Sequence, residues 1–280
     1  MLKTYYLLTK PGILLGNLIT TTAAFLLGSS EHFDLILYLW TATGLGFVIV
    51  SACVWNNYID READAKMERT KNRPLAKQSI STHKACLFAS LLGLLGLLIL
   101  YLFTNKWALL SALLGFFVYV IVYSLSKYKT AQATLIGSVA GAMPPVVGYA
   151  SAADRLDISA LLLFLILVFW QMPHFFSIAM YRADDYKAAS IPVLPGEIGN
   201  AAVKKQSLVY ITLFLAAIAA LSFFGDVKIP FLIGTSILGL LWLKTALQGL
   251  KVEDDIPWAR KMFRVSLIVI SGFSILLSCN

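Results

Sequence analysis

The stretch ACLFASLLGLLGLLILYLF, from Ala85 to Phe103, decides the fold class, because it contains no charged side chain. A helix needs about 20 predominantly apolar residues to cross the hydrocarbon core of a bilayer. A second stretch of the same kind, WALLSALLGFFVYVIVYSL, follows from Trp107 to Leu125. Two such stretches with a short connection between them predict a pair of antiparallel membrane-spanning helices.

Working outward from this pair, the chain divides into nine apolar stretches of spanning length. They cover about residues 11–29, 35–55, 85–103, 107–125, 132–150, 158–181, 207–224, 229–248 and 263–279. Glycines and two prolines, Pro144 and Pro145, interrupt the fifth stretch, which membrane helices tolerate when their neighbours satisfy the freed backbone groups. Small residues such as those from Gly137 to Ala142 also allow helices to pack closely. We therefore expect an all-α polytopic membrane protein that forms a single domain over residues 1–280.

The composition supports a membrane protein and argues against binding of nucleic acid. Hydrophobic residues make up 59% of the chain and charged residues only 14%, whereas soluble domains average about 25% charged residues. The formal net charge is +8, but the basic residues cluster between the apolar stretches. We therefore expect the lipid bilayer, and no nucleic acid, as a partner. Lys3 and Lys10 precede the first stretch and no cleavage-site pattern follows it, so we expect this stretch to remain as a span. The three cysteines have no spacing that predicts a metal or disulfide framework.

The distribution of Lys and Arg predicts the orientation. With a cytoplasmic N-terminus, nine spans place 20 of the 23 basic residues on the cytoplasmic side, and only Lys106, Arg155 and Lys228 on the other. Cytoplasmic loops carry such an excess of basic residues. An eight-span chain without the fifth helix would place the loops at about 126–131 and 182–205 on opposite sides. That arrangement breaks the bias, so we predict nine spans.

The first long cytoplasmic loop, at about residues 56–84, begins with three oxygen-bearing side chains at a spacing of four. If the second span continues as a helix, Asn56, Asp60 and Asp64 lie near one face of it. An amide oxygen and two carboxylates are hard ligands that suit Mg²⁺, which leaves coordination positions for substrate phosphates. Basic residues that could bind phosphate follow; they are Lys66, Arg69, Lys71, Arg73 and Lys77. The alternative is a solvated loop whose charges only set the orientation.

The other long cytoplasmic loop, at about residues 181–206, follows a span that carries a histidine. His174 lies in WQMPHFF, and a polar residue within a span suggests a function. It could bind iron, act as a base or only anchor a bend next to Pro173. The aromatic residues Trp170 and Tyr181 could line a pocket or could face lipid. The loop itself adds four charged residues, Arg182, Asp184, Asp185 and Lys187.

Five segments carry a resemblance to a known family. They are TKPGILLGNLI (Thr9 to Ile19), NNYIDREADAKMERTKNRPL (Asn56 to Leu75), TLIGSVAGAMPPVVGY (Thr134 to Tyr149), WQMPHFFSIAMYRADDYKAASIPVLP (Trp170 to Pro195) and WARKMF (Trp258 to Phe263). In these segments the chain resembles the heme branch of the intramembrane aromatic prenyltransferase superfamily, the protoheme IX farnesyltransferase family. The Asn-x-x-x-Asp-x-x-x-Asp element is common to the superfamily, while the second and fourth segments are more specific to the heme branch.

The resemblance implies a fold and a reaction. The fold is nine transmembrane helices around a central cavity capped by cytoplasmic loops, in the inner membrane of a bacterial cell. The reaction transfers farnesyl from farnesyl diphosphate to the 2-vinyl group of heme b, with addition of water, to give heme O. A heme A synthase or a terminal oxidase would then be a partner for the product.

The resemblance also implies roles for individual residues. Asn56, Asp60 and Asp64 would hold Mg²⁺ and diphosphate, with His174 as a further catalytic candidate. The residues expected to neutralise the diphosphate are Arg61, Arg69, Lys71, Arg73 and Lys127. The residues expected in the heme pocket are Trp170, His174, Tyr181, Asp184, Asp185 and Lys187. Relatives that act on phenols carry a second Asp-x-x-x-Asp, whereas this chain has the adjacent pair Asp184 and Asp185, so we do not expect a complete second metal site.

Three alternative functions remain open at this point. One is prenyl transfer to a phenolic quinone precursor such as 4-hydroxybenzoate, for which a second paired-Asp motif would be expected. Another is a small-molecule transporter, although such proteins usually show internal repeats and ionisable residues at the bilayer midplane. The last is a structural subunit of an oxidase.

Overall fold

The computed structural model describes residues 2–29, 32–225 and 227–280, and within these ranges it is built of helices joined by turns and loops. The described residues include nine helical segments long and apolar enough to cross a membrane. They are α2 (Pro11–Gly28), α3 (Leu35–Ile59), α5 (Thr82–Phe103), α6 (Lys106–Phe117) with its continuation, α8 (Ala133–Ala153), α9 (Ile158–Tyr181), α12 (Asn200–Phe224), α13 (Ile229–Gln248) and α14 (Asp255–Ser278). The shorter helices are α1 (Leu2–Leu8), α4 (Arg61–Asp64), α10 (Ala183–Ala188) and α11 (Leu194–Ile198). This confirms the predicted all-α, nine-span class.

Polar residues in the connections define where several spans begin. The side chain of Asn105 accepts hydrogen bonds from the backbone N–H groups of Trp107 and Ala108, both at 3.0 Å, at the start of α6. Asp157 caps the start of α9 through Ser159 and Ala160 in the same way. Such caps satisfy backbone donors that have no partner within the helix.

Two spans begin earlier than the apolar pattern predicts. Helix α12 begins at Asn200 rather than near 207, and α14 begins at Asp255 rather than near 263. Lys and Arg favour helix as strongly as most apolar residues, so the helices continue past the apolar stretch into the basic segments. The fifth span, α8, is continuous through Pro144 and Pro145. The fourth span contains a π-helical turn, η1 (Val118–Tyr123), before its last turn, α7 (Ser124–Ser126).

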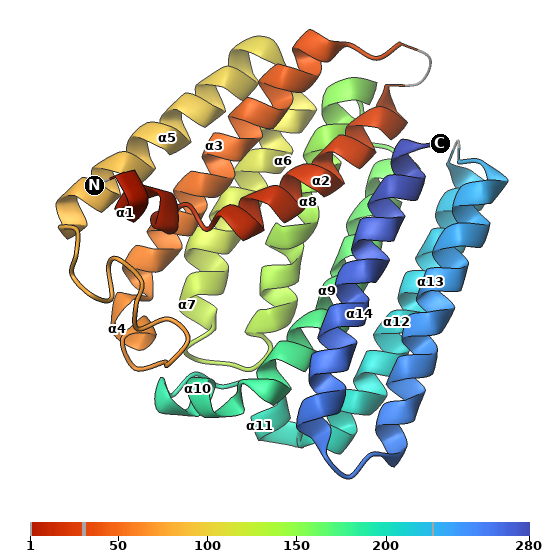
Figure 1. Ribbon diagram of the computed structural model, residues 1–280. Coiled ribbons are helices and arrows are strands. Elements are labelled where there is room, and N and C mark those ends of the chain that lie inside the picture. The colour runs from red at the N-terminus through yellow and green to blue at the C-terminus, as the bar shows by residue number, and fades with distance from the viewer. Residues whose placement is uncertain (1, 30–31, 226) are drawn as a thin grey trace.

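The spans form a bundle in which neighbours in sequence are mostly neighbours in space. Helix α3 packs on α5, α5 on α6, α6 on α8, and α12 and α13 pack on each other and on α9 and α14 respectively. Helices α2 and α9 join the two halves, because α2 contacts α8 and α14 and α9 contacts α8, α12 and α14. Figure 1 shows α4, α10 and α11 at one end of the bundle and the C-terminus at the other.

Small residues permit close approaches between helices. A Cβ atom at Gly148 of α8 would lie 2.2 Å from the backbone oxygen of Thr21 in α2. A Cβ atom at Gly28 of α2 would lie 2.7 Å from the backbone oxygen of Tyr149. Neither position has room for a side chain, so the backbones of α2 and α8 are in direct contact.

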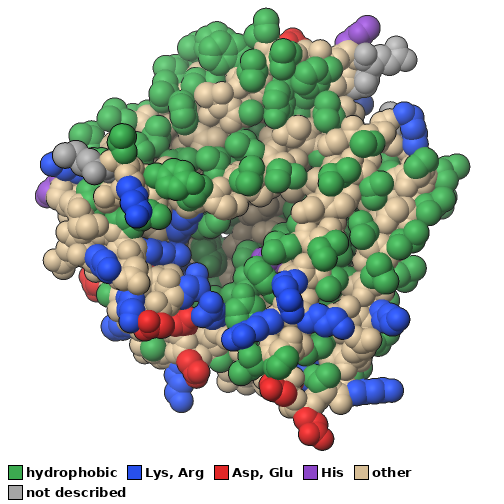
Figure 2. Space-filling view, viewed as in Figure 1, with side chains coloured by type: hydrophobic (Ala, Val, Ile, Leu, Met, Phe, Trp, Pro, Cys, Tyr) green, Lys and Arg blue, Asp and Glu red, His purple; other side chains and the backbone are tan. Residues whose placement is uncertain are grey.

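The outer surface of the bundle is apolar. Leucines on α5 such as Leu91, Leu94 and Leu98 expose half or more of their surface, which a soluble protein would not repeat along a whole helix. Figure 2 shows hydrophobic side chains over most of one face and Lys and Arg side chains gathered toward one end, around a hollow. This is the surface of a multi-pass membrane protein.

Candidate active site

The second span continues as a helical path into the first long loop. The backbone N–H of Asp60 donates to the oxygen of Asn56 at 2.9 Å, and the N–H of Asp64 donates to the oxygen of Asp60 at 2.7 Å. Asn56, Asp60 and Asp64 therefore follow one another at intervals of one helical turn, as the spacing predicts. All three are buried, with 3%, 7% and 1% of their surface exposed.

Asp60 accepts bonds from two residues in the connection between α7 and α8. The ammonium group of Lys127 contacts its Oδ2 atom, and the hydroxyl of Tyr128 donates to its Oδ1 atom at 2.8 Å. Burial lowers the pKa of Lys127, and the neighbouring Asp60 carboxylate opposes that shift. Burial together with the charge of Asp60 raises the pKa of the Tyr128 hydroxyl, so this tyrosine stays a hydrogen-bond donor at neutral pH.

Asp64 is paired with Arg73, which lies nine residues further along the same loop. The Nη1 atom of Arg73 donates to both carboxylate oxygens of Asp64, at 2.9 and 2.7 Å. The hydroxyl of Thr70 donates to the backbone oxygen of Asp64 at 3.0 Å. The loop therefore folds back so that its own arginine neutralises its buried carboxylate.

Asn56 contacts a third cation, Lys10, which the sequence reasoning did not select. The Nζ atom of Lys10 donates to Oδ1 of Asn56 at 2.8 Å, and Nδ2 of Asn56 donates to the hydroxyl of Ser124 at 3.2 Å. Burial lowers the pKa of Lys10 to about 8. Lys10 has a left-handed backbone with φ of 48° just before Pro11, and such strain is often held at functional sites. In the sequence, Lys10 could have been selected because it lies in TKPGILLGNLI, one of the segments that carry the family resemblance.

The π-helical turn η1 supplies the wall next to these residues. It carries Tyr119 and Tyr123, whose rings stack with centroids 5.5 Å apart. The ammonium of Lys127 lies 5.3 Å from the centre of the Tyr123 ring. Gly137 of α8 leaves room for that ring, because a Cβ atom there would lie 2.8 Å from it. Irregular turns of this type are frequent at functional sites.

Of the remaining basic candidates in the first loop, Arg61 and Lys71 have other partners. Arg61 donates to the backbone oxygen of Tyr58 at 2.9 Å and pairs with Glu62. Lys71 pairs with Glu68 at 2.6 Å on the surface. Arg69 is exposed. The structure thus brings Arg73 and Lys127 to the oxygen donors and points Arg61 and Lys71 toward acidic neighbours on the surface.

His174 lies buried between α9 and α14, surrounded by aromatic rings. Its Nδ1 atom is 2.7 Å from the hydroxyl of Ser266. The ring of Trp170 stacks on it at 4.7 Å, and the ring of Phe263 lies at 4.9 Å. The indole N–H of Trp170 donates to the backbone oxygen of Ser266 at 2.9 Å. His174 is thus fixed by neighbours on α14, and its Nε2 atom has no hydrogen bond to the described residues.

The adjacent aspartates of the second long loop have different surroundings. Asp185 is buried and accepts a hydrogen bond from the backbone N–H of Glu68 at 2.9 Å, which joins the two long loops. Asp184 and Lys187 are exposed to solvent. Tyr181, at the end of α9, contacts Phe263 with ring centres 5.9 Å apart.

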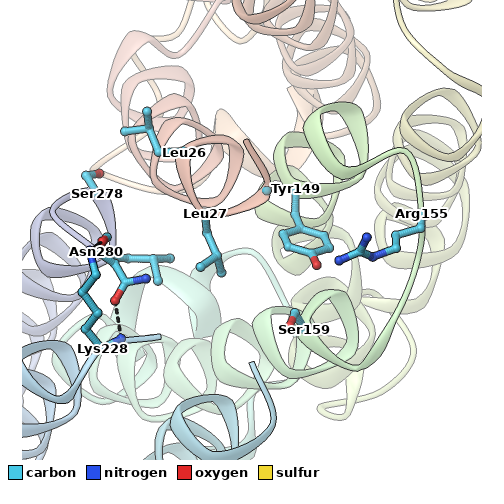
Figure 3. Close-up of a pocket in the computed structure, with 10 residues that line it drawn as sticks. Leu26, Leu27, Tyr149, Arg155, Ser159, Lys228, Ser278 and Asn280 are labelled. Atoms are coloured by element: carbon cyan, nitrogen blue, oxygen red, sulfur yellow. Dashed lines mark hydrogen bonds between the residues drawn. The ribbon is translucent and has the colours of Figure 1, made fainter. Parts of the chain in front are cut away.

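A pocket at the other end of the bundle contains none of the predicted site residues. Figure 3 shows it beside the end of α2, with Tyr149, Ser159 and Arg155 on one side. On the other side, the backbone N–H of Lys228 donates to Oδ1 of Asn280. The buried carboxylates lie at the opposite end, where α3 ends.

The donor set at the end of α3 fits Mg²⁺. The described residues contain no group of three or more His, Cys, Asp or Glu side chains arranged to hold a metal ion. The site offers two carboxylates and one amide oxygen instead, and Mg²⁺ is usually held by one or two carboxylates together with substrate phosphates and water. Buried oxygen donors surrounded by Lys10, Lys127 and Arg73 suit a metal–diphosphate complex.

Fold and site together define an integral-membrane protein with two buried carboxylates, Asp60 and Asp64, paired with Lys127 and Arg73 at one end of a helix bundle. A model of the UbiA prenyltransferase family matches residues 17–268. The chain therefore belongs to the UbiA prenyltransferase family.

Relatives and solved structures agree with this family. The chain is 49% identical to the protoheme IX farnesyltransferase of Protochlamydia amoebophila, covering 98% of this chain and 97% of the relative. It is 46% identical to that of Sodalis glossinidius, covering 100% and 95%. A solved digeranylgeranylglyceryl phosphate synthase has the same fold, with a TM-score of 0.82 at 20% identity over 100% and 99% of the two chains. So does a UbiA homologue from Archaeoglobus fulgidus bound to DMAPP and Mg²⁺, with a TM-score of 0.72 at 16% identity over 99% and 100%.

Proposed function

We propose that the protein transfers the farnesyl group of farnesyl diphosphate to the 2-vinyl group of heme b, with addition of water, to give heme O and diphosphate. The observation that carries this proposal is the likeness, at 49% identity over 98% of the chain, to a protein named protoheme IX farnesyltransferase. Such identity over the whole length includes the loops as well as the spans.

The reaction breaks the C1–O bond of farnesyl diphosphate, the π bond of the vinyl group and one O–H bond of water, and it forms one C–C bond and one C–O bond. The bond between C1 of the farnesyl chain and the diphosphate oxygen breaks, and diphosphate leaves with the electron pair. C1 then bonds to the terminal carbon of the vinyl group, and a water oxygen adds to the other vinyl carbon with loss of a proton. Negative charge develops on the leaving diphosphate, so fixed positive charges near it lower the barrier.

Asn56, Asp60 and Asp64 are the residues proposed to hold Mg²⁺, with Lys127 and Arg73 next to the diphosphate. When bound, the metal ion supplies positive charge to the leaving group. Lys127 and Arg73 already contact the two carboxylates, so they are positioned to turn to phosphate oxygens without a change of fold. Lys10 adds a third cation. The other basic candidates of this loop, Arg61, Arg69 and Lys71, are proposed to help to attract the donor.

The apolar and aromatic walls are proposed to protect the allylic cation from water. Tyr119 and Tyr123 present stacked rings beside Lys127, and aromatic faces attract cations. His174 and Trp170 are proposed to lie along the heme, with Tyr181 and Asp185 near its outer edge. Asp184 and Lys187, which are exposed, would act at most at the entrance.

The proposed location is the inner membrane of a bacterial cell, with the site on the cytoplasmic side. The Lys and Arg residues of the connections support this orientation, because the end of the bundle that carries α4, α10 and α11 also carries most of the basic residues. Heme O formed there would serve a terminal oxidase or a heme A synthase.

The test is a product analysis with purified protein in liposomes. Heme b, farnesyl diphosphate and Mg²⁺ are supplied, with 4-hydroxybenzoate as a competing acceptor, and extracted products are separated and weighed by mass spectrometry. We expect a heme that has gained farnesyl and water, and we expect chelation of divalent metal to abolish it. Prenylation of 4-hydroxybenzoate alone would contradict the proposed acceptor, and no product from folded protein would contradict the proposed reaction.

A further inference from the structure

Three arginines from two helices line one open pocket at the basic end of the bundle. The pocket has a volume of about 440 Å³ and is lined by Tyr181, Arg182, Arg260, Phe263 and Arg264. Tyr181 and Arg182 lie at the end of α9, and the others lie in the first turns of α14. Figure 2 shows Lys and Arg side chains around the lower edge of the hollow at this end.

The positive charge of this pocket is only partly compensated. Arg182 forms an ion pair with the Asp185 carboxylate at 3.8 Å, a distance too long for a hydrogen bond. Among the described residues, no acidic side chain forms an ion pair with Arg260 or Arg264.

The two aspartates at the start of α14 are already engaged. Asp254 caps the helix through the backbone N–H of Ile256 at 3.0 Å. Asp255 contacts Lys204 and accepts a hydrogen bond from Asn200 at 2.7 Å. Neither carboxylate neutralises the arginines of the pocket.

The spacing of the two arginines on α14 favours an anion between them. Arg260 and Arg264 are one helical turn apart, and Nε of Arg264 lies 3.4 Å from the backbone oxygen of Arg260. Like charges at this spacing repel each other. A bound anion removes that repulsion, and the planar guanidinium group matches a carboxylate with two parallel hydrogen bonds.

A run of aromatic rings leads from the arginines into the membrane-spanning part. Phe263 lies between the pocket and His174, with ring centres 5.9 Å from Tyr181 and 4.9 Å from His174. Trp170 continues the run by stacking on His174 at 4.7 Å. The ligand that fits this arrangement is a flat apolar ring system with carboxylates on one edge.

Resting on the proposed function, we propose that Arg182, Arg260 and Arg264 bind the two propionate carboxylates of heme b. Heme b carries both propionates on one edge and its vinyl groups on the opposite edge. Propionates held at the water-facing end of α9 and α14 therefore direct the vinyl edge along Phe263 and His174 into the bundle. The donor diphosphate has its own cations, Lys127 and Arg73, at the end of α3.

The competing ligand is the anionic headgroup of a membrane lipid, which basic residues at helix ends often bind. The basic residues that line the pocket are all arginines, whereas the exposed Lys261 of α14 and Lys251, just before α14, do not line it. Lys261 instead donates to Oε1 of Gln248 at 3.2 Å. These two lysines provide a control with the same loss of charge.

The experiment compares heme b with its dimethyl ester, in which both propionates are neutral, in vesicles of phosphatidylcholine. The variant Arg260→Gln with Arg264→Gln is compared with Lys251→Gln with Lys261→Gln. We expect the arginine variant to weaken heme b binding in an optical titration, and to raise KM for heme b, at least about tenfold, because bonds between charged groups are lost. The KM for farnesyl diphosphate should stay within about twofold. The wild type should bind the dimethyl ester as weakly as the arginine variant binds heme b. The lysine variant should bind heme b as tightly as the wild type does.

Three results would decide against parts of this account. If the arginine substitutions weaken the binding of heme b and of its dimethyl ester by equal factors, the arginines do not bind the propionates. If the effect appears only when phosphatidylglycerol is added to the vesicles, the arginines bind lipid headgroups. If the wild type binds heme b in the arginine-dependent way but does not prenylate it, the proposed function fails while the propionate site stands.

Discussion

At the scale of single residues, the site consists of three side chains whose oxygen atoms each accept a hydrogen bond from a different cation. Asn56 faces Lys10, Asp60 faces Lys127, and Asp64 faces Arg73. A buried carboxylate needs such a partner, because an uncompensated buried charge costs several kcal/mol. The same pairing keeps the cations close to where a diphosphate would bind.

Neutralising either carboxylate should stop turnover without unfolding the protein. We expect Asp60→Asn and Asp64→Asn each to lower kcat by about 100-fold or more, since they remove metal-binding charge next to the leaving group. Steady-state rates with heme b and farnesyl diphosphate measure this. Glu62→Gln is the control, because Glu62 lies in the same loop but is exposed. Near-normal rates in both aspartate variants would rule out the proposed metal site.

Replacing His174 should change the binding of heme b and leave the binding of farnesyl diphosphate unchanged. We expect His174→Ala to weaken heme b binding by about tenfold or to change the heme absorption spectrum, since the ring lies among Trp170 and Phe263. His83→Ala, at an exposed histidine near the start of α5, should behave as the wild type. An unchanged spectrum and affinity in His174→Ala would make His174 a purely structural residue.

Part of this residue-scale picture could be predicted from the sequence. The spacing of Asn56, Asp60 and Asp64 predicts their shared helical path, because it depends only on the local period. Lys10 and Tyr128 could not be found in the same way, since each reaches the site from a different connection. The pairing of Arg73 with Asp64 could not be predicted either, because a loop that folds back has no periodic sequence pattern.

At the scale of helices, the spans were predictable and their charged ends were not. Hydropathy predicts where lipid begins, whereas α12 and α14 continue as helix into Lys- and Arg-rich segments. Hydropathy also does not reveal the π-helical turn that carries Tyr119 and Tyr123, because its sequence VYVIVY is as apolar as the rest of the span. The arginine pocket depends on that continuation of α14, because Arg260 lies before the predicted start of the ninth span.

The contact between α2 and α8 should tolerate no side chain at its closest point. We expect Gly148→Ala to lower stability by about 1–3 kcal/mol, since its Cβ atom would lie 2.2 Å from the Thr21 backbone oxygen. Thermal unfolding in detergent measures the change. Gly16→Ala is the matched control, because no atom lies within 4 Å of its added Cβ. Equal stability of Gly148→Ala and the wild type would contradict the described packing.

At the scale of the whole molecule, the two ends of the bundle differ in charge. The end with the long loops holds the buried carboxylates Asp60 and Asp64 and the arginine pocket, while Arg155 and Lys228 lie at the other end. The two proposed sites place the charged groups of both substrates at this end, which leaves the interior of the bundle for the apolar farnesyl chain and the porphyrin ring.

This difference in charge predicts the orientation of the protein in the membrane. In a variant without native cysteines, a cysteine introduced at Lys187 should react with a membrane-impermeant maleimide only after cells are opened. A cysteine at Arg155 should react in intact cells, because positively charged connections stay in the cytoplasm. The reverse pattern would place the site on the other side of the membrane.

A structure of the protein with Mg²⁺ and farnesyl thiodiphosphate, a donor analogue that ionises slowly, would test the donor site directly. We expect the diphosphate group within contact of Lys127 and Arg73, with the metal ion on Asp60 and Asp64. A diphosphate group bound instead among Arg182, Arg260 and Arg264 would contradict both the donor site and the proposed place of the heme propionates.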